Sequence, residues 1–266
     1  LPEWQQRQEW IRNTLRKVVG PFPAKTALHA RVTQSINKDG YRLEDIIYES
    51  QPGYFVTSSL FIPDKFKNAK GPVIIYCIGH TFSGYAASQA TLLNLVKKGF
   101  IVFAFDPMGQ GERLQYYDPQ TGKSRFKYPS YEHSYPGAQL FITGNTLARD
   151  FIWDGIRAVD YLLTRKEVDP SRIGISGRSG GGTQSAYIAA FDHRIKAAAP
   201  ENYITNFTRL FQSMGPQDAE QDFFHGIEQG IDMADLLLVR APKPAMIITT
   251  SRDMFPIQGS LETAKE

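Results

Sequence analysis

The amino-acid sequence predicts an α/β fold with a mostly parallel, doubly wound sheet and an antiparallel edge near the N-terminus. Two short and wholly apolar segments, 73–78 and 100–105, lie on either side of a helical segment at 88–98. Apolar strands that alternate with helices are typical of parallel sheets covered on both faces. Between 28 and 62, in contrast, β-rich segments are separated by turn signals, which indicates an antiparallel meander.

The other elements of this fold are expected in the order that an α/β chain requires. Apolar residues at helical or alternating spacing define each segment, and Pro or Gly residues mark the breaks between segments. Along the chain we expect a helix at 3–18 and a linker, together 1–26; strands at 29–36, 41–48 and 54–62, with turns at Lys38-Asp39-Gly40 and Gln51-Pro52-Gly53; a helix around 152–163; a strand at 172–176; a helix at 183–190; and strands at 195–199 and 245–250.

Composition and charge narrow the class of protein. Of the 266 residues, 42% are hydrophobic and 21% are charged, and we expect one globular domain over 1–266. The net charge of +3 and the scattered basic residues argue against nucleic acid as a partner, and no apolar run has the length of a membrane span. The single cysteine, Cys77, excludes an intrachain disulfide. No His, Asp and Glu residues show metal-ligand spacing, so we expect no metal and no cofactor. The sequence does not specify an oligomeric state.

The segment 112–145 differs from the rest of the chain because it has no clear periodicity and is rich in tyrosine. An irregular insertion of this length in a compact domain is usually a functional lid or the wall of a pocket. A surface excursion held together by aromatic packing is the alternative, and the sequence leaves both open.

The segment around Ser179 is the main candidate for a catalytic site. Gly177-Arg178-Ser179-Gly180-Gly181 matches the G-x-S-x-G pattern, with a β-type run before it and a helical segment after it. In a nucleophile elbow the serine occupies a strained turn, and the glycines let strand and helix approach closely. The helix N-terminus offers free N–H groups to a developing negative charge. A serine that merely caps the helix is the alternative, but the strand–turn–helix context favours the elbow.

Acyl transfer through a serine also needs an acid that orients a base. Asp253 follows the apolar run 245–250, where the acid of an elbow-type hydrolase is expected, and Glu201 is the fallback. A helix cap or a surface aspartate is the alternative interpretation of Asp253. Asp106 precedes the nucleophile in the chain and is followed by Pro and Gly residues, so we predict a tight structural turn there.

Two backbone N–H groups are expected to form the oxyanion hole. One comes from the loop after the strand at 73–78, from His80 or Thr81, and the other from Gly180 directly after the nucleophile. The side chain of His80 can line the pocket without conflict with this backbone role.

The catalytic base is not identified among the histidines. In elbow-type hydrolases it follows the acid, but no histidine follows Asp253, and His133 in the insertion would give an unusual chain order. The predicted sheet also lacks the strand and helix that would close its C-terminal edge. We therefore expect that the fold is truncated there and that the catalytic histidine comes after Glu266. The five histidines are His29, His80, His133, His193 and His225.

Several motifs between Tyr54 and Glu266 together resemble the acetyl xylan esterase-like branch of the α/β-hydrolases, which is related to the prolyl oligopeptidase and dienelactone hydrolase groups. The ordered set is much more specific than the elbow alone. The motifs are Gly79-His80, Asp106-Pro107-Met108-Gly109-Gln110-Gly111-Glu112-Arg113, Arg157-Ala158-Val159-Asp160-Tyr161-Leu162, the elbow, Gly215-Pro216-Gln217-Asp218-Ala219-Glu220 and Ser251-Arg252-Asp253-Met254-Phe255-Pro256.

The resemblance implies an α/β-hydrolase fold and a serine esterase that removes acetyl or similar small acyl groups from plant polysaccharide such as xylan, in a secreted or periplasmic setting. It implies Ser179 as nucleophile, Asp253 as acid, and His80 or Thr81 with Gly180 as oxyanion donors. The family histidine, in a Gly-His-Gly-like turn, has no match in this sequence. Arg178 also departs from the pattern; we expect it to pair with a carboxylate, or else to line the pocket and favour an acidic sugar.

Other functions remain open from the sequence. A peptidase or a lactone hydrolase would use the same triad, with substrate access set by the 112–145 wall. A non-catalytic carbohydrate-binding homologue would use the same fold without a working base.

Overall fold

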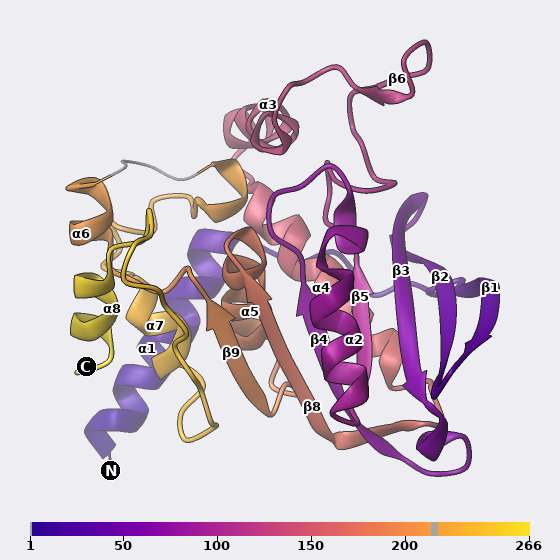
Figure 1. The fold of residues 1–266 in the computed structure, drawn as a ribbon. Helices are drawn as coiled ribbons and strands as arrows, with labels where there is room; N and C mark the ends of the chain where they lie inside the picture. Colours follow the sequence, from indigo (N-terminus) through magenta and orange to yellow (C-terminus); the bar gives the residue numbers. More distant parts are fainter. Residues whose placement is uncertain (1, 214–217) are drawn as a thin grey trace.

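A central mixed sheet organises the fold (Figure 1). The computed structural model describes residues 2–213 and 218–266. Within them, seven strands form one sheet in the order β1 (Arg31–Lys38), β2 (Tyr41–Gln51), β3 (Tyr54–Pro63), β5 (Ile101–Phe105), β4 (Gly71–Cys77), β8 (Val168–Arg178) and β9 (Ala197–Glu201). The last four of these are parallel, whereas β1, β2 and β3 form an antiparallel meander that pairs with β5. The predicted sheet with its antiparallel N-terminal edge is confirmed.

Two glycine turns set the register of the meander. Gly40 and Gly53 connect its strands with φ of +84° and +74°, a conformation that residues with a side chain rarely adopt. Both glycines lie in the turns that the sequence predicts. The turns bring Arg42 opposite Ile62 and keep the two long strands paired along most of their length.

Helices cover both faces of the sheet. The described α-helices are α1 (Pro2–Val19), α2 (Gln89–Lys97), α3 (Pro129–Ile142), α4 (Leu147–Leu162), α5 (Gly180–Phe191), α6 (Phe207–Phe211), α7 (Met233–Leu238) and α8 (Ile257–Thr263). Neighbouring residues of a strand face opposite sides. Val102 of β5 therefore packs with Leu92 of α2, while Phe103 packs in the other cluster with Val159 of α4. This arrangement confirms the doubly wound fold.

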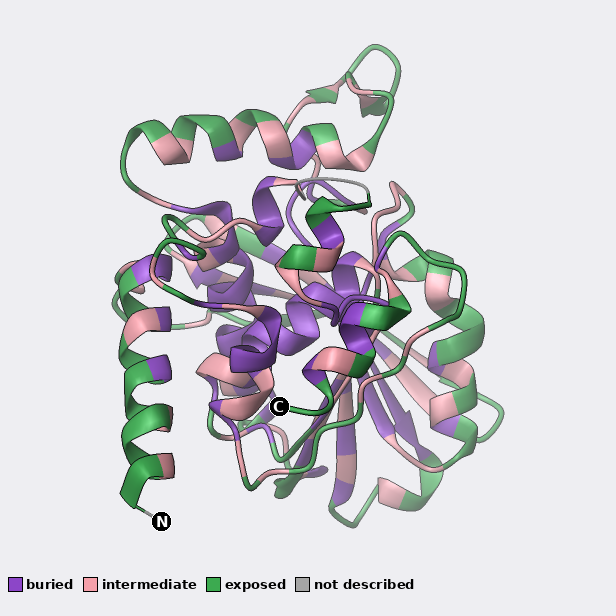
Figure 2. Cartoon of the chain, turned by 90° about the vertical axis from the view of Figure 1, so that its left-hand side faces the viewer, coloured by how far each residue is buried: buried purple, intermediate pink, exposed green. Residues whose placement is uncertain are grey.

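The N-terminal helix α1 is anchored along one side of the molecule (Figure 2). It buries Ile11 and Leu15 in the core cluster that also contains residues of α4, α5 and α7. Gln8 Nε2 donates to the carbonyl of Ala241 at 2.8 Å, and Arg7 pairs with Asp235 at 2.7 Å. The predicted helix is therefore present and belongs to the core. Across the described residues, neither this helix nor any other is long and apolar enough to cross a bilayer.

The insertion at 112–145 is more regular than the sequence predicts. It contains a short hairpin, β6 (Tyr117–Asp118) and β7 (Lys123–Ser124), followed by the 14-residue helix α3 beyond the carboxyl ends of the parallel strands (Figure 1). The helix was missed because its buried positions are Glu132, His133 and Gly137, which give no apolar periodicity. Glu132 accepts hydrogen bonds from the backbone N–H groups of Gln115 and Tyr116 at 2.7 and 3.2 Å, and so fixes the hairpin to the helix.

The segment 245–250 is not the continuous strand that the sequence predicts. It makes two isolated parallel bridges to β9, Ala198 with Ala245 and Glu201 with Ile248. Met246 and Ile248 donate backbone hydrogen bonds to Ala198 and Pro200 at 2.9 and 3.1 Å. The segment thus lies at the edge of the sheet, as expected. The side chains of Met246 and Ile248 are 61% and 36% exposed. Burial of apolar side chains therefore does not stabilise this segment as a regular strand.

A buried ion pair fixes the loop after β5 to helix α4. Arg113 Nη2 lies 2.8 Å from Asp154 Oδ2, and both side chains are buried. Replacing Arg113 with Met is expected to lower the free energy of unfolding by about 3–5 kcal/mol, because Asp154 would remain buried without its partner. Urea denaturation followed by circular dichroism measures this loss.

The matched control is the exposed pair of Arg172 with Asp169, whose atoms lie 2.6 Å apart while 53% of the Arg172 side chain is exposed. Arg172→Met is expected to change the free energy of unfolding by no more than about 1 kcal/mol. Equal losses for the two variants would show that burial does not decide the strength of these pairs.

Candidate active site

Ser179 occupies a strained turn between β8 and α5. Its backbone has φ +59° and ψ −123°, and its N–H donates to the carbonyl of Glu201 at 2.9 Å. A positive φ at a residue with a side chain costs about 1–3 kcal/mol and is concentrated at functional sites. The Ser179 side chain makes no capping hydrogen bond to α5. The serine therefore does not cap the helix, and the turn has the geometry of a nucleophile elbow.

The elbow glycines allow α5 to approach the sheet closely. A Cβ atom on Gly181 would collide with the carbonyl oxygen of Cys77 on β4. A Cβ on Gly180 would lie 2.6 Å from Glu220 Oε1 and 2.8 Å from His80 Nδ1. The elbow is therefore packed against β4 on one side and against the His80 ring on the other.

A cavity of about 590 Å³ opens beside Ser179. Its walls come from the loop after β4, the insertion helix α3, and the segments around 220 and 254. The lining residues are His80, Tyr128, Pro129, Ser130, Ser134, Ser179, Asp218, Gln221, Met254 and Phe255. The insertion thus supplies one wall of the cavity that contains the candidate nucleophile.

The expected oxyanion donors differ in availability. The N–H of Thr81 donates to Gln110 Oε1 at 2.5 Å, so it is already used. Gly180 is the first residue of α5, and its N–H belongs to the helix N-terminus, where the dipole favours negative charge. Of the two alternatives in the loop, His80 is therefore the better candidate to act with Gly180.

The two candidate acids lie at the carboxyl edge of the sheet. Asp253 is exposed, and its carboxylate accepts hydrogen bonds from Thr250 Oγ1 at 3.1 Å, from the N–H of Phe255 at 3.2 Å and from Asn202 Nδ2. The residues after it, Met254 and Phe255, line the cavity. Glu201 instead accepts from Ser176 Oγ at 2.8 Å. Asp253 is thus the candidate acid that is continuous with the cavity wall.

Two other residues for which the sequence analysis predicts a role, Asp106 and Arg178, do not line the cavity beside Ser179. Asp106 accepts hydrogen bonds from Thr57 Oγ1 at 2.9 Å and from the N–H of Tyr85 at 3.0 Å, in the structural turn predicted for it. Arg178 is exposed, and no carboxylate pairs with it within 2–213 and 218–266, so its expected ion pair is not found. Residues 215–217 of the motif that ends at Glu220 lie outside the described residues.

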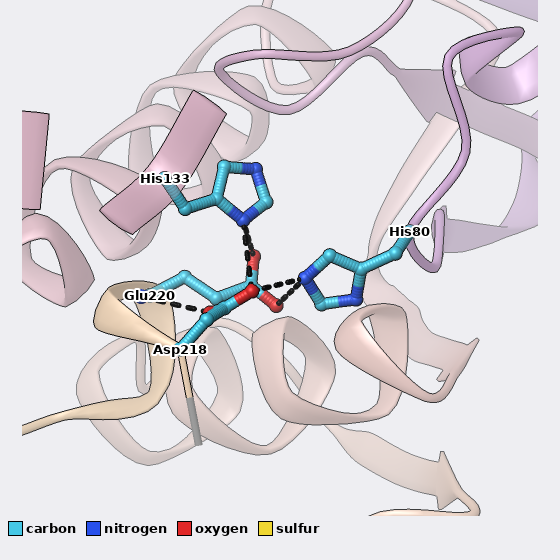
Figure 3. A group of neighbouring side chains, drawn as sticks. All are labelled: His80, His133, Asp218 and Glu220. Carbon is cyan, nitrogen blue, oxygen red and sulfur yellow. Dashed lines mark hydrogen bonds and ion pairs between the residues drawn. The ribbon is translucent and has the colours of Figure 1, made fainter. Parts of the chain in front are cut away.

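Four residues that the sequence did not connect meet beside the elbow (Figure 3). They are His80, His133 on α3, Asp218 directly before a short 3₁₀ turn, and Glu220 within that turn. One ligand-type atom from each residue lies within 4.8 Å of all the others. No metal site was expected, because spacing along the chain gives no such cluster; only folding brings positions 80, 133 and 218–220 together. The one local signal was the Asp-x-Glu pair.

His80, Asp218 and Glu220 shift one another's pKa values. Burial alone would lower the pKa of His80, but Glu220 and hydrogen-bonded Asp218 outweigh it and raise that pKa to about 9. Burial raises the pKa of Glu220 to about 7, against the opposing effect of His80. Burial would also raise the pKa of Asp218, but hydrogen bonds to His133 and His80 hold it below its usual range.

A strained serine elbow on a doubly wound sheet defines a protein of the α/β-hydrolase class. The profile of the acetyl xylan esterase (AXE1) family matches residues 9–228, well over half of the chain. The chain therefore belongs to the acetyl xylan esterase family.

Individual relatives are distant. YtaP of Bacillus subtilis (strain 168) is 24% identical over 204 residues, which is 70% of this chain and 60% of YtaP. The chain thus spans less than two thirds of the length of that relative. The crystal structure of BF1801 from Bacteroides fragilis NCTC 9343 is similar with a TM-score of 0.75 and 20% identity, over 92% of this chain and 68% of that one. A glucuronoyl esterase from Solibacter usitatus is similar with a TM-score of 0.68 and 16% identity, over 97% and 77%. These two likenesses concern the fold.

Proposed function

We propose that the protein is a serine carboxylic ester hydrolase that removes acetyl groups from plant polysaccharide such as xylan. The observation that carries the proposal is Ser179, a strained elbow serine on the wall of a 590 Å³ cavity in a chain of the acetyl xylan esterase family. A cavity beside a nucleophile suits a small acyl group on a larger alcohol.

In the proposed reaction, Ser179 Oγ attacks the carbonyl carbon of the acetyl ester and gives its proton to the base. The N–H groups of His80 and Gly180 stabilise the oxyanion that forms, and each such donor contributes about 3–4 kcal/mol to transition-state stabilisation. The intermediate then expels the sugar alkoxide, which takes the proton from the base, and leaves an acetyl-serine. Water deacylates Ser179 by the same route and releases acetate.

Asp253 is proposed to orient the base, and we assign the role of the base to none of the histidines in residues 1–266. The ring of His80 lines the cavity, but its Nε2 lies 2.6 Å from Asp218 Oδ2 and 3.3 Å from Glu220 Oε1. That nitrogen is thus held by carboxylates, and we do not give His80 the base's role.

Substrate choice is proposed to depend on the insertion. Tyr128 lines the cavity and is 49% exposed, and an exposed aromatic ring at this place can pack on the face of a sugar. We expect hydrolysis of acetylated xylan and small acyl esters to exceed hydrolysis of peptides and lactones.

Acetate release and proton release, measured across a panel of these substrates, test the proposal. Faster turnover of peptides or lactones than of every acetyl ester would assign the same site to the peptidase or lactone-hydrolase alternative.

A further inference from the structure

We propose that His80, His133, Asp218 and Glu220 form a binding site for a divalent transition-metal ion, with Zn²⁺ as the ion that fits best (Figure 3). Two imidazole nitrogens and two carboxylate oxygens are a ligand set that Zn²⁺ accepts in tetrahedral geometry. The proposal concerns metal binding and does not depend on the esterase reaction.

The separations between the four ligand groups fit one small cation. In a tetrahedral Zn²⁺ site with bonds of about 2.0–2.2 Å, ligand atoms lie about 3.4 Å apart. His80 Nε2 is 3.3 Å from Glu220 Oε1, and His133 Nδ1 is 3.2 Å from Asp218 Oδ2 and 3.6 Å from Glu220 Oε2. The fourth separation, His80 Nε2 to Asp218 Oδ2, is 2.6 Å and needs to widen by a fraction of an ångström. Each histidine nitrogen thus lies near both carboxylates, and one ligand-type atom from each of the four residues lies within 4.8 Å of the others, so small side-chain shifts suffice to surround one cation.

The tautomer of His133 supports a cation at this point. His133 Nε2 lies 2.9 Å from the carbonyl oxygen of Met108, which can only accept, so Nε2 carries the hydrogen. When the ring is neutral, the lone pair of Nδ1 points towards Asp218 and Glu220, which are acceptors themselves, so a cation there takes the place of the hydrogen that a protonated ring donates to Asp218. A histidine whose second nitrogen is fixed by a backbone carbonyl is the usual arrangement at a metal.

Glu220 gives an independent indication. Its side chain is 1% exposed, and neither carboxylate oxygen has a hydrogen-bond donor among the described residues. A buried carboxylate without donors is costly unless a cation lies close to it. Both oxygens face the two histidines, as Figure 3 shows, and a metal between these groups would satisfy the carboxylate and both rings together.

The ion would join three parts of the fold that are distant in sequence. His80 follows β4, His133 lies on the insertion helix α3, and Asp218 and Glu220 belong to the 3₁₀ turn η3 (Ala219–Gln221) and its N-cap. Four protein ligands leave no open position, which is typical of a structural metal. The ion would therefore fix the cavity wall to the elbow, because Gly180 packs directly against Glu220 and His80.

Metal content of the whole protein tests the proposal directly. We expect about one zinc ion per chain after dialysis against Zn²⁺ and removal of loose ions, and a visible absorption band of tetrahedral Co²⁺ when cobalt replaces zinc. Ser179→Ala should bind the same amount, which separates this result from any failure of the esterase proposal. Less than about a tenth of an ion per chain together with no cobalt band would overturn the site and leave two protonated imidazoles as the cations that balance the carboxylates.

Variants locate the ion. Glu220→Gln keeps the size of the side chain and should weaken zinc affinity by at least about 10-fold, as should His133→Gln. His225→Gln is the control, because His225 also lies beside a glutamate, Glu228, but on the surface. Circular dichroism confirms that each variant is folded. Zinc binding that is unchanged in both Glu220→Gln and His133→Gln would place the ion elsewhere and refute the proposal.

Discussion

Replacing Ser179 with alanine is expected to lower kcat/KM for acetyl ester hydrolysis by about 10⁴–10⁶-fold. Without the hydroxyl no acyl-enzyme can form, and only binding and the oxyanion donors would remain to assist water. The backbone at 179 already has φ +59°, and alanine keeps a Cβ there, so the fold should be retained. Initial rates on a chromogenic acetyl ester measure the loss.

Ser185→Ala is the matched control. It lies in the same helix, and its hydroxyl donates to the carbonyl of Gly182 at 2.9 Å, so its removal should leave the rate nearly unchanged. A serine-reactive phosphonate should label the wild-type protein and the control at Ser179, and should not label Ser179→Ala. If the wild-type protein hydrolyses no ester and takes up no label, the non-catalytic carbohydrate-binding alternative is the better account.

The elbow and the sheet could be predicted because their information is local. The apolar strands around 75 and 103 are continuous in sequence, and their helices follow at short range. The turns at Gly40 and Gly53 are specified by residues that permit a positive φ. The strained turn at Ser179 also rests on adjacent residues, since the glycines around it permit the close approach of α5. Each of these features is encoded within about ten residues of chain.

The helix α3 shows why a different kind of element was missed. Its buried residues are charged or polar, namely Glu132 and His133, and their partners lie elsewhere in the chain. Glu132 is satisfied by the backbone of 115–116, and His133 by the carbonyl of Met108. A helix held by buried polar contacts gives no hydrophobic periodicity, so only the folded structure reveals it.

The His80 cluster could not be predicted for a related reason. Its members come from three segments, and the contact between His80 and Asp218 spans 138 residues. The sequence places His80 correctly in the loop after a strand and leaves His133 as a histidine that could reach a pocket. It cannot place both rings against the same pair of carboxylates, because that depends on how the insertion folds over the sheet.

Asp253→Asn is expected to lower kcat by about 10⁴-fold in a preparation that hydrolyses acetyl esters, because an amide cannot stabilise the protonated base or hold its tautomer. Glu201→Gln is the matched comparison, because it removes the same charge at the end of β9, where the carboxylate accepts a hydrogen bond from Ser176 Oγ. The rate of this variant should stay within about tenfold of wild type. Melting temperatures of both variants separate loss of activity from loss of folding.

The comparison of Asp253 with Glu201 also decides how the edge of the sheet is used. Asp253 follows the irregular segment 245–250, which is held to β9 by two isolated bridges, whereas Glu201 ends a regular strand. A large loss at Asp253 alone means that this irregular edge is positioned well enough to orient a base, through the hydrogen bonds from Thr250 and Phe255. A large loss at Glu201 alone would assign the acid to β9, one strand inward. There the backbone carbonyl of Glu201 itself accepts the N–H of Ser179, and the contacts of Asp253 would be structural.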